Sequence, residues 1–102
     1  MVTVAGEVDL STAPVLEAAI AEALAAEPTV LVVELSAVDF MASSGLRVLA
    51  ATQQMVSKSA QLAVVADKPA TRRPIEVTDL DKVFALYSTL DDALADVPTT
   101  AD

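Results

Sequence analysis

The first part of the chain shows two kinds of hydrophobic pattern. Apolar and polar side chains alternate at the start of residues 1–9, which predicts a strand that ends near residue 9. Apolar residues then recur at helical spacing through residues 12–26, and Pro14 falls early enough there for its missing N–H to cost nothing. We therefore predict a first helix over residues 12–26, with Ser11 or Thr12 as its cap.

Continuous apolar runs replace alternation in the middle of the chain. Residues 30–33 and 62–65 are short runs of apolar side chains, as expected for strands that other elements cover on both faces. Between them, a turn at residues 43–45 leads into an apolar stripe at helical spacing, which predicts a second helix over residues 44–59. The first of these strands is predicted to be internal and parallel.

A break at residues 67–69 separates this region from a short third helix. Thr71 is expected to cap that helix, and Pro74 then lies near enough to its start to be tolerated. Residues 83–87 combine apolar, β-branched and aromatic side chains, so they are predicted to form the fourth strand.

The end of the chain predicts a final short helix and a tail. Ser88 or Thr89 precedes Asp92 in a pattern close to a capping box, and residues 98–102 are expected to be a frayed tail. Strands that alternate with helices at this spacing favour a mostly parallel sheet with right-handed crossovers. The predicted fold class is α/β, with four strands in one domain.

Composition narrows the kinds of partner. With 102 residues, 54% of them apolar, the chain is long enough for one domain with a modest core. The formal net charge of -9 opposes the positive field that nucleic acids and anionic lipid surfaces require, so neither is expected as a direct partner. No signal peptide or membrane-spanning run is recognised, and a soluble cytoplasmic domain is the simplest interpretation.

Residue types needed for most catalysis are missing. The chain has no cysteine and no histidine, which excludes thiol chemistry and removes the usual general base for a serine nucleophile. With only Gly6 and Gly45, it contains neither a dinucleotide-binding fingerprint nor a P-loop. The aspartates at residues 79–92 lack the spacing of a metal-binding loop and are interpreted as caps and turns. We expect no enzyme activity, no metal and no cofactor.

The pair Ser43 and Ser44 is the best candidate for function. Both lie at the predicted start of the second helix, where free backbone N–H groups and the helix dipole favour an anion. A plain capping role is the alternative, but no acidic side chain follows in the first turn, and Arg47 opposes the dipole there. A phosphate would offset that unfavourable charge.

Three segments together resemble STAS domains, specifically bacterial anti-sigma factor antagonists. They are residues 6–13 (GEVDLSTA), 33–47 (VELSAVDFMASSGLR) and 78–84 (TDLDKVF). The resemblance covers nearly the whole chain, and its middle segment is the most specific. It assigns residues 1–97 to one STAS domain, followed by the tail.

The resemblance implies a partner switch. In such proteins, the unphosphorylated antagonist binds an ATP-dependent anti-sigma factor kinase of the histidine-kinase-like fold and frees a sigma factor; a serine phosphatase reverses the kinase's phosphorylation. By motif position the phosphorylated serine is Ser43. The implied partner-binding surface consists of Asp9, Ser11, Thr12, Ser43, Ser44, Gly45, Leu46 and Arg47.

The chain differs from the usual family pattern in three places. Ala42 stands where members commonly carry Asp, and Pro74 stands where many have an ordinary helix former. The family also usually begins with an additional strand before the segment at Gly6, whereas Met1 lies only five residues upstream. We therefore expect either a truncated chain or an unpaired sheet edge, and an unpaired edge would favour a homodimer.

Two other functions stay open at this point. The first is a constitutive STAS interaction subunit of a transport or signalling complex, in which Ser43 only caps a helix; Ala42 is its best support. The second is sensing of a small molecule or nucleotide at the same helix end, which the scarcity of aromatic side chains makes weaker.

Overall fold

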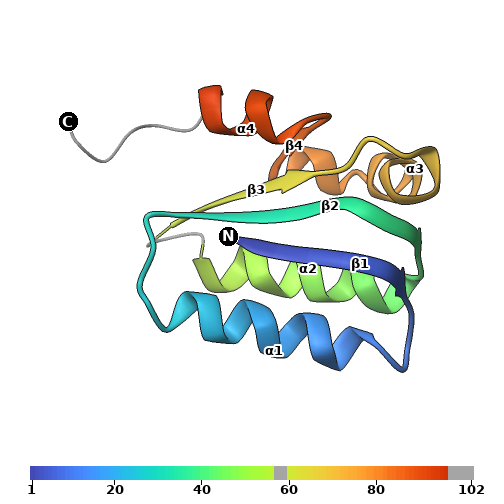
Figure 1. The fold of residues 1–102 in the computed structure, drawn as a ribbon, viewed down its shortest axis with the longest axis horizontal. Helices are drawn as coiled ribbons and strands as arrows, with labels where there is room; N and C mark the ends of the chain where they lie inside the picture. Colours follow the sequence, from blue (N-terminus) through green and yellow to red (C-terminus); the bar gives the residue numbers. More distant parts are fainter. Residues whose placement is uncertain (57–59, 97–102) are drawn as a thin grey trace.

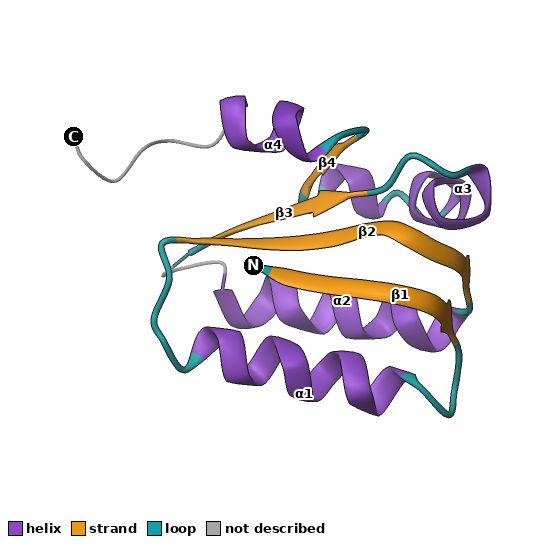
Figure 2. Ribbon diagram, in the orientation of Figure 1, coloured by secondary structure: helices purple, strands orange, loops and turns teal. Residues whose placement is uncertain are grey.

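The computed structural model describes residues 1–56 and 60–96, which form one sheet flanked by helices (Figures 1 and 2). Its elements in chain order are β1 (Val2–Val8), α1 (Ala13–Leu24), β2 (Val30–Met41), α2 (Ser43–Val56), β3 (Gln61–Val65), α3 (Pro69–Val77), the 3-10 turn η1 (Leu80–Lys82), β4 (Ala85–Tyr87) and α4 (Leu90–Asp96).

The sheet has the order β1-β2-β3-β4, and all three pairings are parallel. Helices α1 and α2 cover one face of the sheet, while α3 and α4 lie over the other face (Figure 1). The predicted α/β class and four-stranded sheet are thus confirmed. Within the described residues β1 pairs only with β2, so it forms one edge of the sheet.

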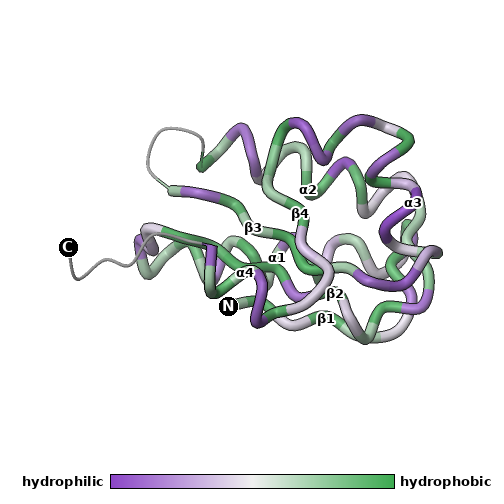
Figure 3. The backbone as a smooth tube through the Cα atoms, turned by 90° about the horizontal axis from the view of Figure 1, so that it is seen from above, coloured by the Kyte–Doolittle hydropathy of each residue, from purple (hydrophilic) through white to green (hydrophobic). Residues whose placement is uncertain are grey.

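Strands β2 and β3 carry the core because helices lie on both of their faces. Val33, Leu35 and Val64 are fully buried there, and Leu49 of α2 packs in the same cluster. Viewed from above, most of β3 is coloured as hydrophobic (Figure 3). A second, smaller cluster beneath α4 joins Val32 to other apolar residues on that face. Two-sided burial explains why these strands lack an alternating pattern.

The boundary between β2 and α2 differs from the prediction. The apolar run that predicted this strand covers residues 30–33, whereas β2 continues to Met41, and α2 begins at Ser43. Pairing with β1 keeps the chain extended, since Glu7 pairs with Phe40 and Val8 with Met41. Tertiary pairing therefore overrides the polar positions in this segment. The predicted turn at residues 43–45 is wrong, because these residues form the first turn of the helix.

Helix α3 also begins earlier than predicted. Lys68 is extended and Pro69 occupies the first turn, where its fixed φ favours a helix start. Thr71 is therefore inside the helix rather than its cap, and its buried hydroxyl donates to the carbonyl of Val38 at 3.2 Å. Pro74 is interior too, and not near the helix start as expected.

The last strand is shorter than predicted. Residues 83 and 84 precede β4, because the chain turns through η1 and the N–H of Phe84 bonds to the carbonyl of Leu80 at 3.1 Å. Phe84 is buried in the core. Thr89 does cap the last helix, since its hydroxyl accepts the N–H of Asp92 at 3.0 Å.

Two predicted segments lie outside the described residues, namely the last turn of the second helix at residues 57–59 and the tail at residues 98–102. Among the described helices, none has the length and apolar character needed to cross a membrane.

Candidate functional site

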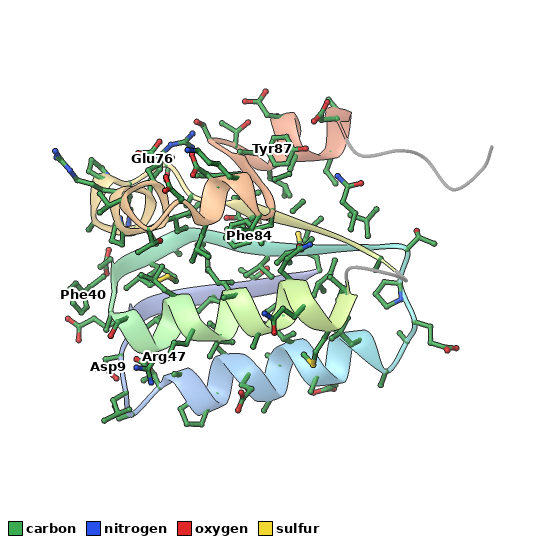
Figure 4. The ribbon with its side chains drawn as sticks, turned by 180° about the vertical axis from the view of Figure 1, so that it is seen from behind. Asp9, Phe40, Arg47, Glu76, Phe84 and Tyr87 are labelled. Carbon is green, nitrogen blue, oxygen red and sulfur yellow. The ribbon has the colours of Figure 1, made fainter. Side chains whose placement is uncertain are left out.

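The carboxyl ends of β1 and β2 place the predicted site residues at one end of the molecule. The N–H of Ala42 donates to the carbonyl of Val8 at 2.7 Å, directly after the pairing of Val8 with Met41. The loop after β1 and the first turn of α2 therefore meet. In Figure 4, Asp9 and Arg47 are both at this end of the molecule, and Phe40 projects from the end of β2.

Gly45 allows α2 to begin this close to the strands. A Cβ atom added there would lie 2.7 Å from Cγ1 of Val8 and 3.0 Å from Cγ of Met41. The first distance is shorter than real side-chain contacts allow, and both neighbours are buried. The small residue thus fixes the separation between the start of α2 and the ends of β1 and β2.

The two serines have different surroundings. Ser43 is exposed, whereas Ser44 is half-buried and its Oγ atom is buried without a hydrogen-bond partner. A buried hydroxyl without a partner costs about 1–3 kcal/mol. Only Ser43 therefore presents its hydroxyl to an approaching protein.

Neither serine caps α2. The first hydrogen bonds of the helix are accepted by the carbonyl of Ala42, from the N–H of Gly45 at 3.0 Å and the N–H of Leu46 at 3.3 Å. The side chain of Ala42 contains no acceptor, and no acidic residue follows in the first turn. Ser43 is the first residue of the helix, so the plain capping role weighed from the sequence is wrong.

Asp9 organises the neighbouring turn. Its carboxylate accepts the backbone N–H and the hydroxyl of Ser11 at 3.0 and 2.7 Å, and the N–H of Thr12 at 3.1 Å. In return, Oγ1 of Thr12 accepts the N–H of Asp9 at 2.8 Å. This exchange has the reciprocal pattern of a capping box, but it closes the turn that precedes α1, whose N-cap residue is Thr12. The hydroxyl of Ser11 and the N–H of Thr12 lower the pKa of Asp9, since both bond to its charged form.

The predicted Ser11 or Thr12 cap is right in position, because Thr12 is the N-cap residue of α1, but its side chain makes no capping bond to the helix, and the bonds of the turn centre on Asp9. Asp9 followed by Thr12 three positions later was a readable signal for the reciprocal bonds. Two of the predicted partner-binding residues are part of the packed interior, since Gly45 is buried and Leu46 is half-buried and packs against the core.

An ion pair borders the same end and was missed from the sequence. Nζ of Lys68 lies 2.9 Å from Oδ1 of Asp39, which ties the loop after β3 to the end of β2. Both side chains are largely exposed, so the pair contributes at most about 1 kcal/mol. No sequence signal links these residues, because they are far apart in the chain.

Metal chemistry has no candidate cluster in the described part of the chain. No group of three or more acidic side chains there is arranged to hold a metal ion. Asp79, one of the aspartates considered from the sequence, instead lies 3.5 Å from Nζ of Lys82.

Fold and site together define a small α/β domain that presents an exposed serine, at a helix start, on the carboxyl end of a parallel sheet. The model of the STAS domain family matches residues 1–93. The chain belongs to this family, as the resemblance predicted.

Two similar proteins are described as anti-sigma factor antagonists. Over 97 residues the chain is 50% identical to the anti-sigma-F factor antagonist RsfB of Mycobacterium tuberculosis, covering 95% of this chain and 80% of that protein. It is 55% identical to the crystal structure of an anti-sigma factor antagonist from Mycobacterium paratuberculosis, with a TM-score of 0.87 over 91% of this chain and 80% of that one.

A more distant structure shares the fold. A putative anti-sigma factor antagonist from Thermotoga maritima is 23% identical, with a TM-score of 0.76 over 90% of this chain and 80% of that one.

Proposed function

We propose that this protein is an anti-sigma factor antagonist switched by phosphorylation of Ser43. In its unphosphorylated form it binds an anti-sigma factor kinase, and this binding frees the sigma factor that the kinase had held. The kinase transfers phosphate to Ser43 and a serine phosphatase removes it. Because the sigma factor that it frees works in the cytoplasm, we expect the protein to act there too. The antagonists at 50% and 55% identity support the role.

The observation that carries this proposal is the contrast between the two serines. Ser43 is exposed, while Oγ of its neighbour Ser44 is buried. A kinase needs to reach the hydroxyl oxygen, so Ser43 is the better acceptor of the two.

The surroundings of Ser43 also suit a phosphate. Ala42 and the first turn of α2 supply no side-chain acceptor or acid to compete for the free N–H groups, and exposed Arg47 lies one turn further along the helix. Phosphorylation adds about -1.5 to -2 charges, which the helix start stabilises locally. The domain is thus expected to stay folded when it is modified.

The same charge weakens partner binding. An interface fitted to a neutral hydroxyl would have to desolvate the phosphate, and the carboxylate of Asp9 at the same end repels it. A penalty of about 2.8 kcal/mol is enough to weaken binding roughly a hundredfold. No change in fold is needed for the switch.

The direct test is incubation of the protein with a candidate anti-sigma factor kinase and ATP, followed by mass spectrometry. We expect one phosphate on Ser43 in the wild-type protein and in Ser44→Ala, and none in Ser43→Ala. Phosphate on Ser44 would contradict the assignment. Binding to the kinase without phosphorylation would instead favour the constitutive STAS subunit.

The edge position of β1 supports a second partner proposal. Its outer edge has no strand beside it among the described residues, which favours pairing with a second copy of the chain. Light scattering at increasing concentration tests this. The apparent mass should rise for the wild-type protein and stay monomeric when Ala5→Pro blocks the edge.

A further inference from the structure

Several large apolar side chains are exposed at the same end as Ser43, including Val15 in the first turn of α1, which is 69% exposed. Leu10, in the turn after β1, is 82% exposed, and Phe40, near the end of β2, is 48% exposed. Single exposed apolar residues are common on protein surfaces. These two differ because they occupy the two segments that adjoin the start of α2, which the contact between Ala42 and Val8 brings together.

The turn holds Leu10 in a fixed position. The carboxylate of Asp9 and the hydroxyl of Thr12 bond to each other's backbone N–H groups on either side of it. The hydroxyl of Thr12 also lies 2.9 Å from the carbonyl of Glu7. Leu10 is therefore presented to solvent by a closed hydrogen-bonded turn, and little conformational entropy remains to be lost in that backbone on binding.

The backbone of Phe40 is held by the sheet. It pairs with Glu7 in the sheet, and the next residue, Met41, is buried. On its other side, Asp39 is bonded to Lys68. Its ring projects away from the body of the molecule at the end that also carries Asp9 and Arg47 (Figure 4).

We propose that Leu10 and Phe40 are the apolar anchors of the antagonist, and that they insert into an apolar pocket on the anti-sigma factor. This inference rests on the proposed function. The charges beside the anchors are mixed, since Asp9, Asp39 and the Glu7 that pairs with Phe40 are accompanied by Arg47 and Lys68. An apolar centre with a polar, charged rim is typical of the energetic core of an interface.

The anchors explain how a phosphate on Ser43 acts. Ser43 follows Phe40 by three residues, so the modification would place a strongly hydrated group next to the apolar contact. Closing the interface would require removing that hydration, which is unfavourable in an apolar pocket. The phosphate thus opposes burial of both anchors.

The test is titration calorimetry of the anti-sigma factor with Leu10→Ala and Phe40→Ala. Matched controls are Met55→Ala and Leu94→Ala, whose side chains are 60% and 54% exposed on α2 and α4. We expect each anchor variant to bind about tenfold or more weakly, with a less negative heat-capacity change. The controls should bind like the wild-type protein. All four positions are exposed, so the variants should remain folded.

Equal affinities for anchor and control variants would overturn this inference and leave the proposed function standing. Loss of self-association in Phe40→Ala, with anti-sigma factor binding unchanged, would assign the patch to contact between two copies and would also overturn it. Failure of the wild-type protein to bind any anti-sigma factor would overturn the proposed function itself, and the inference with it.

Discussion

Three adjacent residues at the start of α2 have different surroundings and therefore different roles. Ser43 is exposed, the hydroxyl of Ser44 is buried, and Gly45 contacts the strands. Helical geometry explains the difference, because successive residues point about 100° apart around the axis. Of these three small residues, Ser43 is therefore the candidate for modification and Gly45 makes the packing contact.

Gly45→Ala should destabilise the domain. The added Cβ would lie 2.7 Å from Cγ1 of Val8, and forced overpacking of this kind costs about 1–3 kcal/mol. Helix propensity alone favours alanine by about 1 kcal/mol, so it acts in the opposite direction. Urea unfolding measures the net effect, which we expect to be a loss.

The matched control for Gly45→Ala is Ala51→Met, which enlarges an exposed position of the same helix. Its free energy of unfolding should stay within about 0.5 kcal/mol of wild type. A stabilised Gly45→Ala protein would show that the start of α2 has room to move, contrary to the close approach described above.

The carboxylate of Asp9 should make the free energy of unfolding depend on pH in the acid range. Its pKa is lowered in the folded protein, so its ionised form favours folding; this contribution is present above the ordinary pKa of about 4 and is lost as the pH falls through the lower folded value. Asp9→Asn should therefore reduce the free energy of unfolding at neutral pH. The difference from wild type should shrink under acid conditions.

Urea unfolding at neutral and acid pH tests the role of Asp9. Glu22→Gln is the control, because Glu22 is exposed on α1. A difference between Asp9→Asn and wild type that does not change with pH would contradict the role assigned to the ionised carboxylate.

Helices and strands could be predicted from the sequence where the local hydrophobic pattern determines them. The runs that became β3 and α1 were found to within a few residues, since burial and helical spacing leave direct traces in the sequence. The polar end of β2 was not, because only pairing with β1 keeps it extended. At the site, the position of Ser43 followed from the motif, but the burial of Ser44 depends on packing that no local pattern records.

Helix α3 is joined to β2 by one buried hydrogen bond that can be tested. Thr71→Val removes the donor to the carbonyl of Val38 while keeping the shape, which should cost about 1 kcal/mol or more. Thr52→Val is the matched control. Thr52 is also buried, but its hydroxyl bonds to Val48 within its own helix, where the carbonyl keeps a backbone donor.

The free energies of unfolding of Thr71→Val and Thr52→Val should therefore differ, with the larger loss for Thr71→Val. Equal losses would mean that the bond between α3 and β2 contributes nothing beyond the packing of the side chain.

At the scale of the whole molecule, the carboxyl end of β1 and β2 and the core behind it have different roles. The described carboxyl end of β1 and β2 gathers the exposed serine, the turn organised by Asp9, and the anchors Leu10 and Phe40. The core behind them, between the two layers of helices, contains most of the buried apolar side chains. A rigid body that carries one modifiable surface can switch partners through local charge, without refolding.

The most direct measurement is the affinity of the anti-sigma factor kinase for this protein with and without phosphate on Ser43. Calorimetry should compare unmodified protein with protein whose single phosphate on Ser43 has been verified by mass spectrometry. We predict that the phosphate weakens binding roughly a hundredfold, equivalent to about 2.8 kcal/mol, while the free energy of unfolding changes little. Equal affinities for the two forms would contradict the switch.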